Sequence, residues 1–370
     1  MRIGIPAETE PGETRVAATP ETVKKLTAGG RHTVLVENGA GLGASITDDA
    51  FVTAGATLGC KADVYQSDLV LKVQRPQPSE LPLLRRDSIL IGLLAPHEDL
   101  TELAATGVTA FAMERLPRIS RAQNMDVLSS QANIAGYKAV LIAAYEYGRF
   151  MPMLMTAAGT VKAARVLVLG AGVAGLQAIA TAKRLGAVIE AFDVRPEVKE
   201  QVESLGAKFV EVALSDDERK AQESAGGYAR EMSADYKQRQ SVLIAERAKA
   251  ADIVITTALI PGRPAPVLVT EATVKGMKPG SVIVDLASRQ GGNCELSLAG
   301  QVVVRHGVKI AAPTNTPASL AADASALYAR NLFNFLGLLL DAKSGALTVN
   351  REDEIIAATL VCSGGTPVRS

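Results

Sequence analysis

The sequence predicts an α/β fold of two doubly wound domains, joined by two long helices with a cleft between them. Short apolar runs alternate with helix-length amphipathic segments, which is the pattern of parallel sheets covered on both faces. The length of 370 residues is typical of two domains rather than one. Hydrophobic residues make up 48% of the chain and aromatic residues only 4%, so small aliphatic side chains must build the cores.

Strand and helix signals alternate from the N-terminus. Thr19-Pro20-Glu21 begins a helix, because Thr caps it, Pro fits the first position and Glu favours the first turn. Gly29-Gly30 ends this helix, and Thr47 begins another. The strands expected around these helices are 2–6, 33–37, 69–73, 89–93 and 108–112.

A long helix over 132–147 leads into a second run of the same alternation. Its strands are expected at 165–169, 188–192, 208–210, 253–256 and 281–285, with helices at 174–185 and 196–205. A final long helix over 318–340 returns the chain to the first domain. We therefore assign residues 1–131 and about 318–370 to the first domain, and 132–317 to the second.

One polar stretch, residues 213–240, shows no strand pattern and holds Gly226-Gly227-Tyr228 near its middle. Structureless stretches of this length are uncommon in compact domains and are often lids or binding loops. On length alone, a mobile lid and a solvated helical excursion broken by glycines are equally good interpretations.

Charge and composition exclude several classes of protein. Lys+Arg and Asp+Glu both number 39, so the chain lacks the positive charge of nucleic-acid-binding proteins. Cys60, Cys294 and Cys362 are too few and too scattered for a disulfide framework or a metal site. The N-terminus lacks a secretory pattern, and the apolar stretch 332–340 is too short to span a bilayer. We expect a soluble cytoplasmic protein without a bound metal.

A glycine-rich motif, Gly170-Ala171-Gly172-Val173-Ala174-Gly175, lies between an expected strand and an expected helix. This context is typical of a Rossmann-like dinucleotide-binding turn. The first glycine permits the tight turn, the second lets the backbone approach a pyrophosphate, and the third lets helix and strand pack closely. The N-terminus of the helix then presents N–H groups to the phosphates.

Asp193 ends the next expected strand, where an acid can bind both hydroxyls of the adenine ribose. Its carboxylate also repels a 2′-phosphate, which favours NAD over NADP. Arg195 weakens this argument, because an arginine at this point can accept a 2′-phosphate or can simply be a surface cation at a helix start.

Two further segments have both a functional and a structural interpretation. The small residues of 256–262 follow a core strand and can line the second half of a dinucleotide, or form an ordinary turn; Asp285 has the same two interpretations. Residues 117–130 gather Arg, Gln, Asp and Ser between the two expected domains. These groups can orient a nicotinamide, or form an ordinary connector.

With these motifs in place, the chain closely resembles domain I, the NAD(H)-binding subunit, of the proton-translocating NAD(P) transhydrogenases. The resemblance covers nearly the whole chain, and 117–130 is its most specific segment. The motifs that carry it are Glu13-Thr14-Arg15-Val16-Ala17, 117–130, Ala157-Ala158-Gly159-Thr160, 170–175, Glu200-Gln201-Val202, 226–228 and 256–262.

The resemblance implies a subunit that binds NAD(H) and is active only with its partners. Those partners are an NADP(H)-binding beta subunit and a membrane subunit that couples hydride transfer to proton flow. The implied enzyme is a transhydrogenase of the Si-specific or Re/Si-specific class. The chain is then expected as a homodimer, held at the cytoplasmic face of the inner membrane through its partners.

The resemblance also implies roles for individual residues. Those expected at the nicotinamide end are Arg118, Gln123, Asp126 and Ser129, with Tyr228 on a mobile loop that closes over the nucleotide. Those expected to bind the rest of the cofactor are Gly170, Gly172, Val173, Ala174, Gly175, Asp193, Val194, Arg195, Gly227, Thr257, Ala258 and Leu259.

Alanine dehydrogenase shares this family fold and is the main alternative. Arg15 and Lys72 match its substrate-binding cations, but Leu93 and Arg289 stand where it has its catalytic His and Asp. An amino acid dehydrogenase needs such an acid/base pair, whereas direct hydride transfer between nicotinamides needs positioning and water exclusion. An NAD-binding sensor without turnover is a further alternative that the sequence leaves open.

Overall fold

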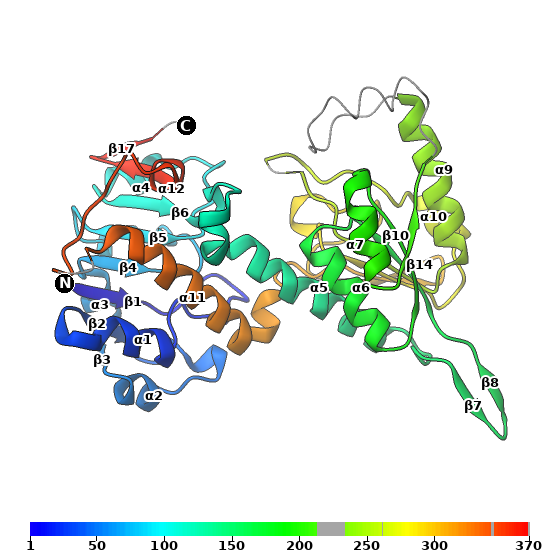
Figure 1. The fold of residues 1–370 in the computed structure, drawn as a ribbon, viewed down its shortest axis with the longest axis horizontal. Helices are drawn as coiled ribbons and strands as arrows, with labels where there is room; N and C mark the ends of the chain where they lie inside the picture. Colours follow the sequence, from blue (N-terminus) through cyan, green and yellow to red (C-terminus); the bar gives the residue numbers. More distant parts are fainter. Residues whose placement is uncertain (213–233, 261, 342–343, 369–370) are drawn as a thin grey trace. The chain divides into compact units, whose positions relative to one another are not determined.

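The structure, a computed structural model, describes residues 1–212, 234–260, 262–341 and 344–368. It divides into two compact units: unit 1 is Met1–Gln131 with Pro317–Ser370, and unit 2 is Ala132–Thr316. Figure 1 shows that each unit is built around its own sheet, with helices packed against it.

Within the described residues, unit 1 carries an eight-stranded sheet in the order β17-β16-β6-β5-β4-β1-β2-β3. Strands β1 to β6 are parallel, whereas β16 is antiparallel to both β6 and β17. The strands are β1 Arg2–Ile5, β2 Thr33–Glu37, β3 Thr57–Gly59, β4 Leu69–Leu71, β5 Ile89–Gly92, β6 Thr109–Ala112, β16 Leu360–Ser363 and β17 Thr366–Pro367. The helices are α1 Pro20–Thr27, α2 Asp48–Thr53, α3 Lys61–Tyr65, α4 Thr101–Ala105, α11 Ala321–Leu339 and α12 Glu354–Thr359.

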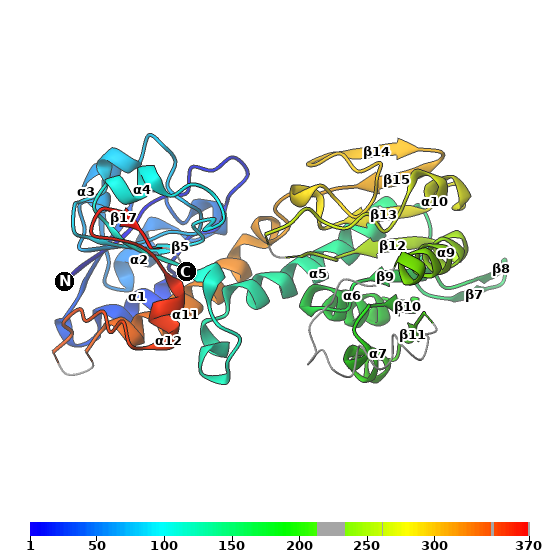
Figure 2. The ribbon, with the colours of Figure 1, turned by 90° about the horizontal axis from the view of Figure 1, so that it is seen from above.

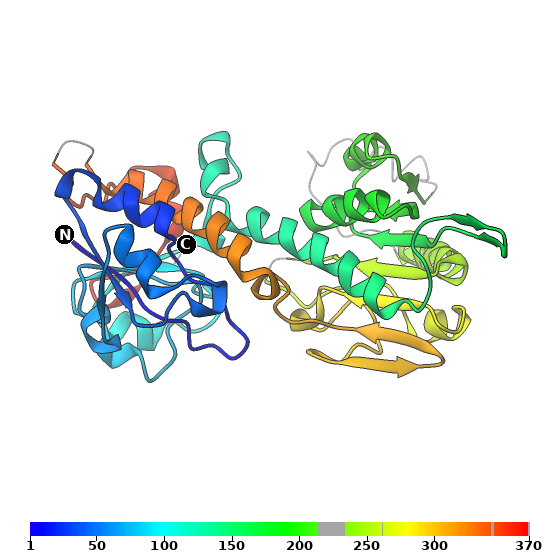
Figure 3. The ribbon, with the colours of Figure 1, turned by 90° about the horizontal axis from the view of Figure 1, so that it is seen from below.

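Helices α1 and α11 lie side by side in unit 1 (Figures 1 and 3), joined at the surface by an ion pair between Arg330 and Glu21. On β4, Leu69 and Leu71 belong to the core cluster on the α11 side, whereas Val70 belongs to a separate cluster. Both faces of the sheet are therefore buried, which explains why the strand is apolar at every position.

Over its described residues, unit 2 carries a seven-stranded sheet in the order β11-β10-β9-β12-β13-β15-β14, which Figure 2 shows from β14 to β11. The sheet is parallel except for the edge strand β14. The strands are β9 Arg165–Leu169, β10 Val188–Phe192, β11 Lys208–Val210, β12 Ile253–Thr256, β13 Val282–Asp285, β14 Val302–Arg305 and β15 Val308–Ala311. The helices are α6 Val173–Arg184, α7 Lys199–Ser204, α9 Ala234–Ala250 and α10 Glu271–Gly276; α5 is Val127–Glu146.

The strand order of unit 2 reverses between β9 and β12, because β10 and β11 lie on one side of β9 and the later strands on the other. Unit 1 repeats this plan with its reversal between β1 and β4. In doubly wound sheets, ligands bind beyond the carboxyl ends of the strands at such a reversal. The predicted α/β class with two doubly wound sheets is confirmed.

Several local predictions differ from the structure. Of the two interpretations of 213–240, the lid is wrong for 234–240, which form the start of α9 and fit the helical alternative; residues 213–233 lie outside the described residues. The prediction failed because this helix is polar on most sides and carries only Tyr236, Ile244 and Ala248 as buried side chains. The segment 117–130 is not all connector, since its last four residues already belong to α5.

A small hairpin that the sequence pattern did not predict is formed by β7 Leu154–Thr156 and β8 Gly159–Val161. It forms a two-stranded sheet of its own, and Figure 1 shows it projecting from the rest of unit 2. Each strand has only three residues, too few for an alternating pattern to stand out.

Candidate nucleotide-binding site

The glycine-rich turn joins the end of β9 to the start of α6. Gly170 has a φ of 100°, a left-handed conformation that favours glycine. A Cβ at Gly175 would lie 1.8 Å from the carbonyl oxygen of Gly170, so helix and strand pack too closely for a larger residue. A Cβ at Gly172, the N-cap of α6, would lie 3.9 Å from Nη2 of Arg195, at ordinary contact distance. The turn is therefore tightly packed on the side of Gly175 and open on the side of Gly172. This is the shape of a pyrophosphate-binding turn, and Gly170–Gly175 are called the glycine cradle below.

Helix α5 packs closely against the start of α6. A Cβ at Gly136 would lie 2.0 Å from the carbonyl oxygen of Ala174 in the first turn of α6. Val173, the first residue of α6, is 38% exposed beside it. Packing against α5 therefore fixes the first turn of α6, and with it the orientation of the backbone N–H groups at the N-terminus of that helix.

The loop after β12 lies against the glycine turn. Thr257 donates a hydrogen bond from Oγ1 to the carbonyl oxygen of Gly170 at 3.0 Å. Buried Asn293 holds the next residue: its Oδ1 accepts from the backbone N–H of Ala258 at 3.0 Å, and its Nδ2 donates to the Ala258 carbonyl at 2.9 Å. Leu259, which follows, is 49% exposed. The loop is therefore held in place at Thr257 and Ala258 while its next side chain faces solvent.

Asn293 is a positioning residue that the sequence analysis missed. It contacts Ala258 across 35 residues of chain, and nothing in the local pattern signals that pairing. Its Nδ2 also donates to the carbonyl oxygen of Pro266 at 2.8 Å, so one amide joins both ends of the loop.

Asp193 lies just beyond β10, next to the glycine turn. Its Oδ2 accepts from the backbone N–H of Ala171 at 2.8 Å, and its Oδ1 accepts from the backbone N–H of Arg195 at 2.9 Å. The guanidinium of Arg195 pairs with the same carboxylate at 2.9 Å. Burial alone would raise the pKa of Asp193, but the hydrogen bonds from Arg195 outweigh it and hold that pKa below its ordinary value. The residue is therefore charged at neutral pH.

Asp285 has a structural role rather than a binding one. It is fully buried at the end of β13, where Oδ1 accepts from Thr256 and Ala287, and Oδ2 accepts from Cys294 and Ser297. Both oxygens are therefore used by the protein itself. Of the two interpretations of Asp285, the geometry favours the structural one.

The segment 117–130 lies in unit 1, where it forms the 3-10 helix η5 (Ser120–Met125) and the start of α5. Asp126 accepts hydrogen bonds from the backbone N–H and the Oγ of Ser129, at 2.9 and 2.6 Å. This is the geometry of a helix N-cap. Arg118 and Gln123 are exposed. The segment thus pairs two of its predicted site residues with each other and presents the other two at the surface.

Two contacts anchor this segment to the rest of unit 1. Arg121 makes a two-bond ion pair with Asp353, the N-cap of α12, at 2.7 and 2.9 Å. The carbonyl oxygen of Asn124 accepts from the side-chain amides of Asn331 and Asn334 on α11. The backbone that carries Arg118 and Gln123 is therefore held from two helices.

The predicted site residues thus form two groups on different units. In unit 2 the structure brings together Gly170, Gly172, Gly175, Asp193, Arg195 and Thr257, with Ala174, Ala258, Val173, Val194 and Leu259 next to them in the chain. Gly227 and Tyr228, expected on the closing loop, lie outside the described residues.

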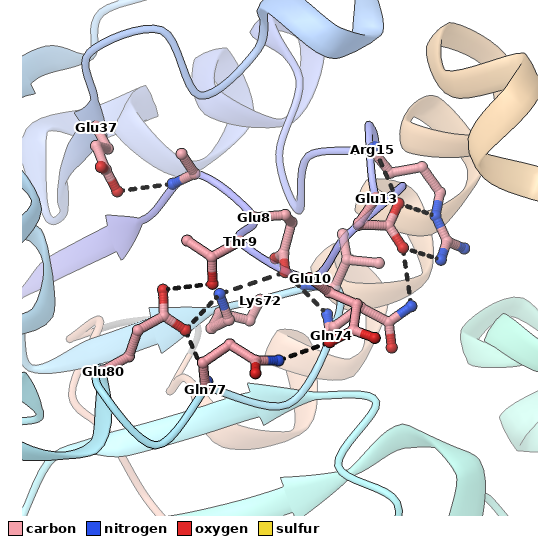
Figure 4. A network of polar contacts seen from close by, with 12 residues as sticks. Glu8, Thr9, Glu10, Glu13, Arg15, Glu37, Lys72, Gln74, Gln77 and Glu80 are labelled. Carbon is pink, nitrogen blue, oxygen red and sulfur yellow. Dashed lines mark hydrogen bonds and ion pairs between the residues drawn. The ribbon is translucent and has the colours of Figure 1, made fainter. Parts of the chain in front are cut away.

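A network of buried charges occupies the strand reversal of unit 1 (Figure 4), directly after β1 and β4. Lys72 is fully buried, with its Nζ 3.3 Å from Glu8 and 3.5 Å from Glu80. Arg15 makes a two-bond pair with Glu13, at 2.7 and 2.6 Å. Each cation is therefore neutralised by carboxylates of its own unit.

This pairing bears directly on the alanine dehydrogenase alternative. The resemblance matches Arg15 and Lys72 to the substrate-binding cations of that enzyme, and here Glu13, Glu8 and Glu80 engage them. Burial alone would raise the pKa of Glu13, but hydrogen bonds from Arg15 lower it to about 2. The carboxylate therefore stays charged, and a substrate carboxylate would have to displace it.

The strand order, the glycine cradle and the adjacent acid define a two-unit Rossmann-like protein of the dinucleotide-binding class. Family models agree with this description: the N-terminal domain of Alanine dehydrogenase/PNT matches residues 4–135, and the C-terminal domain matches residues 139–369. The chain belongs to the alanine dehydrogenase/PNT family, a family of NAD-binding oxidoreductases.

Individual relatives lie closer to one branch of the family. The chain is 54% identical over 378 residues to the first section of the alpha subunit of NAD(P) transhydrogenase from Rhodospirillum rubrum, a match that covers all of this chain and 98% of that protein. A transhydrogenase crystal structure from Sinorhizobium meliloti matches with a TM-score of 0.90 and 50% identity over the full length of both chains. Alanine dehydrogenase of Bacillus subtilis is 33% identical over 306 residues, 80% of this chain and 72% of that protein. The predicted resemblance is confirmed.

In the portion of the chain that the structure describes, none of the helices is long and apolar enough to cross a membrane. No cluster of three or more His, Cys, Asp or Glu side chains suited to a metal ion occurs among these residues either.

Proposed function

We propose that this chain is the NAD(H)-binding component of a proton-translocating transhydrogenase. Hydride passes directly between a nicotinamide held by this chain and NADP(H) held by a partner subunit, and a membrane subunit couples the transfer to proton flow. The glycine cradle at the strand reversal, with Asp193 beside it, is the observation that carries the proposal. The relatives named as transhydrogenase alpha subunits support this choice of reaction.

In this proposal unit 2 is the nucleotide-binding domain. Gly170, Gly172 and Gly175 let the backbone and the N-terminus of α6 approach the pyrophosphate, and Asp193 accepts from the adenine ribose. Thr257, Ala258 and Leu259 line the second half of the cofactor, on a loop fixed by Asn293. When bound, the nicotinamide supplies the hydride chemistry.

Unit 1 contributes orientation in this proposal. Arg118 and Gln123, exposed on a well-anchored segment, contact the nicotinamide end, and Asp126 with Ser129 fixes the backbone there. Such a protein needs no acid/base pair, which fits Leu93 and Arg289 at the positions where the dehydrogenase has one.

The partners follow from the same reaction. The second nicotinamide comes from an NADP(H)-binding beta subunit, and the chain is held at the cytoplasmic face of the inner membrane through the membrane subunit. We also propose a homodimer. Exposed apolar side chains at and before the β7–β8 hairpin, Tyr145, Phe150, Met153 and Met155, support a second copy packing there.

Equilibrium dialysis with NADH and NADPH tests the binding half of the proposal. NADH should bind much more tightly, because Asp193 is charged and opposes a 2′-phosphate. Asp193→Asn should narrow the difference between the two nucleotides. Equal affinity of the unmodified protein for both would contradict the proposal.

A further inference from the structure

The side chain of Arg195 fills acceptor positions of Asp193 that, in the proposed function, a ribose would use. Two of the four hydrogen bonds to this carboxylate come from backbone N–H groups, those of Ala171 and Arg195. The other two come from the guanidinium of Arg195: Nε donates to Oδ1 at 3.0 Å and Nη2 to Oδ2 at 2.9 Å. A carboxylate has about four acceptor positions, so this one is saturated.

The two kinds of bond differ in what can break them. The backbone bonds fix the carboxylate at the edge of the glycine turn, and Pro196 directly after Arg195 begins the 3-10 helix η6 (Pro196–Val198), which restrains the backbone. The guanidinium bonds depend on a side chain that is 31% exposed and can rotate off the carboxylate. Only the side chain has to move for one acceptor on each oxygen to become available.

We propose that Arg195 is a specificity-determining residue that competes with the ribose of the nucleotide for Asp193. The guanidinium leaves the carboxylate before a 2′,3′-diol can bind both oxygens, and the displaced cation stays beside the 2′ position. Arg195 therefore lowers the affinity for nucleotides with a free 2′-hydroxyl. It also raises the affinity for nucleotides with a 2′-phosphate, because its charge offsets that of Asp193. This inference rests on the proposed binding of NAD(H) at this turn.

The surroundings of the pair support this role. Nη2 of Arg195 lies 3.9 Å from the position of a Cβ at Gly172, so the guanidinium borders the open side of the cradle. The carboxylate of Asp193 is nearly inaccessible, with 6% of its side chain exposed. A ribose that bonds to both oxygens of Asp193 therefore has to replace the guanidinium bonds.

The test is the affinity of Arg195→Met for NADH and for NADPH, measured by isothermal titration calorimetry. NADH should bind roughly tenfold more tightly, because a competing charge-assisted hydrogen-bonded pair no longer has to be broken. NADPH should bind more weakly, because Asp193 then faces the 2′-phosphate without a neighbouring cation. Arg195→Lys keeps the charge but cannot form both hydrogen bonds to the carboxylate. The affinity for NADH should therefore rise, while the affinity for NADPH should change little.

Lys199→Met is the matched control. Lys199 is an exposed cation four residues further along the chain, paired with Glu211 at 2.9 Å rather than with Asp193. Like Arg195→Met, this control removes one positive charge. Its ratio of NADH affinity to NADPH affinity should equal that of the unmodified protein.

A double-mutant cycle separates competition from a general loss of charge. In the Asp193→Asn background, Arg195→Met should leave NADH affinity unchanged, because the competition is already gone. Weaker NADH binding by Arg195→Met would overturn the inference, and so would an equal change in the Lys199→Met control. An unmodified protein that binds neither nucleotide would overturn the proposed function itself, which distinguishes the two failures.

Discussion

Substitution of the third glycine of the turn tests the shape of the cradle. In Gly175→Ala the added Cβ would lie 1.8 Å from the carbonyl oxygen of Gly170, and a real Cβ essentially never comes within 3.0 Å of a neighbour. Both partners of this clash belong to backbone elements, so α6 and β9 have to separate. Overpacking of this kind costs about 1–3 kcal/mol of unfolding free energy, or about 2–4 °C in Tm for each kcal/mol.

Gly172→Ala is the matched substitution on the open side of the same turn. Its Cβ would lie 3.9 Å from the nearest atom of Arg195, and the residue has a φ of −75° that alanine adopts freely. Loss of stability should stay below about 1 kcal/mol, yet the methyl group would stand where a pyrophosphate approaches. Both variants should therefore lose at least tenfold in NADH affinity, whereas only Gly175→Ala should have a clearly lowered Tm.

Thermal unfolding and titration calorimetry on the two variants give both quantities. A Gly175→Ala protein with unchanged Tm and NADH affinity would refute the steric reasoning. Equal losses of Tm in the two variants would refute the distinction between the closed and open sides of the cradle.

The buried polar contacts give three more expected outcomes. The pKa of Glu13 is lowered from 4.5 to about 2, so its contribution to stability is complete above pH 4.5 and is lost as the pH falls toward 2. Glu13→Gln should therefore lower the free energy of unfolding least at the acid end of a urea-unfolding series. A loss of unfolding free energy that is the same at every pH would contradict this. Asn293→Ala should cost about 1–3 kcal/mol in denaturant unfolding, because the Ala258 N–H loses its buried partner, and should weaken NADH binding; unaltered NADH affinity would show that the loop does not line the site. The chain should not reduce NAD with L-alanine, because Leu93 and Arg289 cannot serve as acid and base and Glu13 engages Arg15; steady NADH production by pure protein would contradict this.

The sequence predicted the parallel strands well because burial on both faces leaves an unmistakable pattern. Residues 165–169 are apolar after the first position, and in the structure Val166 and Val168 face one core cluster while Leu167 and Leu169 face another. The glycine turn was equally predictable, because the spacing of Gly170, Gly172 and Gly175 reflects steric needs local to the chain.

Features that depend on distant residues were not predictable in the same way. The bonds from Asn293 to Ala258, and from Asp285 to Ser297, join loops whose proximity only the folded sheet creates. The pairing of Lys72 with Glu8 requires β1 and β4 to be neighbours, although two strands lie between them in the chain. Asp193 and Arg195 are two residues apart, but their spacing did not reveal that the guanidinium fills the acceptor positions of the acid.

The central claim, that this chain holds one of two reacting nicotinamides, is tested most directly by reconstituted hydride transfer. Transfer from NADH to an NADP analogue, followed by absorbance, should be negligible with the pure protein, because two nicotinamides must come within about 3–3.5 Å to react. Adding the soluble NADP-binding domain of a transhydrogenase should switch transfer on. Arg118→Ala and Gln123→Ala should lower that rate more than they weaken NADH binding, whereas Glu102→Gln, at an exposed position of α4, should do neither. Fast transfer by the pure protein, or none after a partner demonstrably docks, would contradict the account.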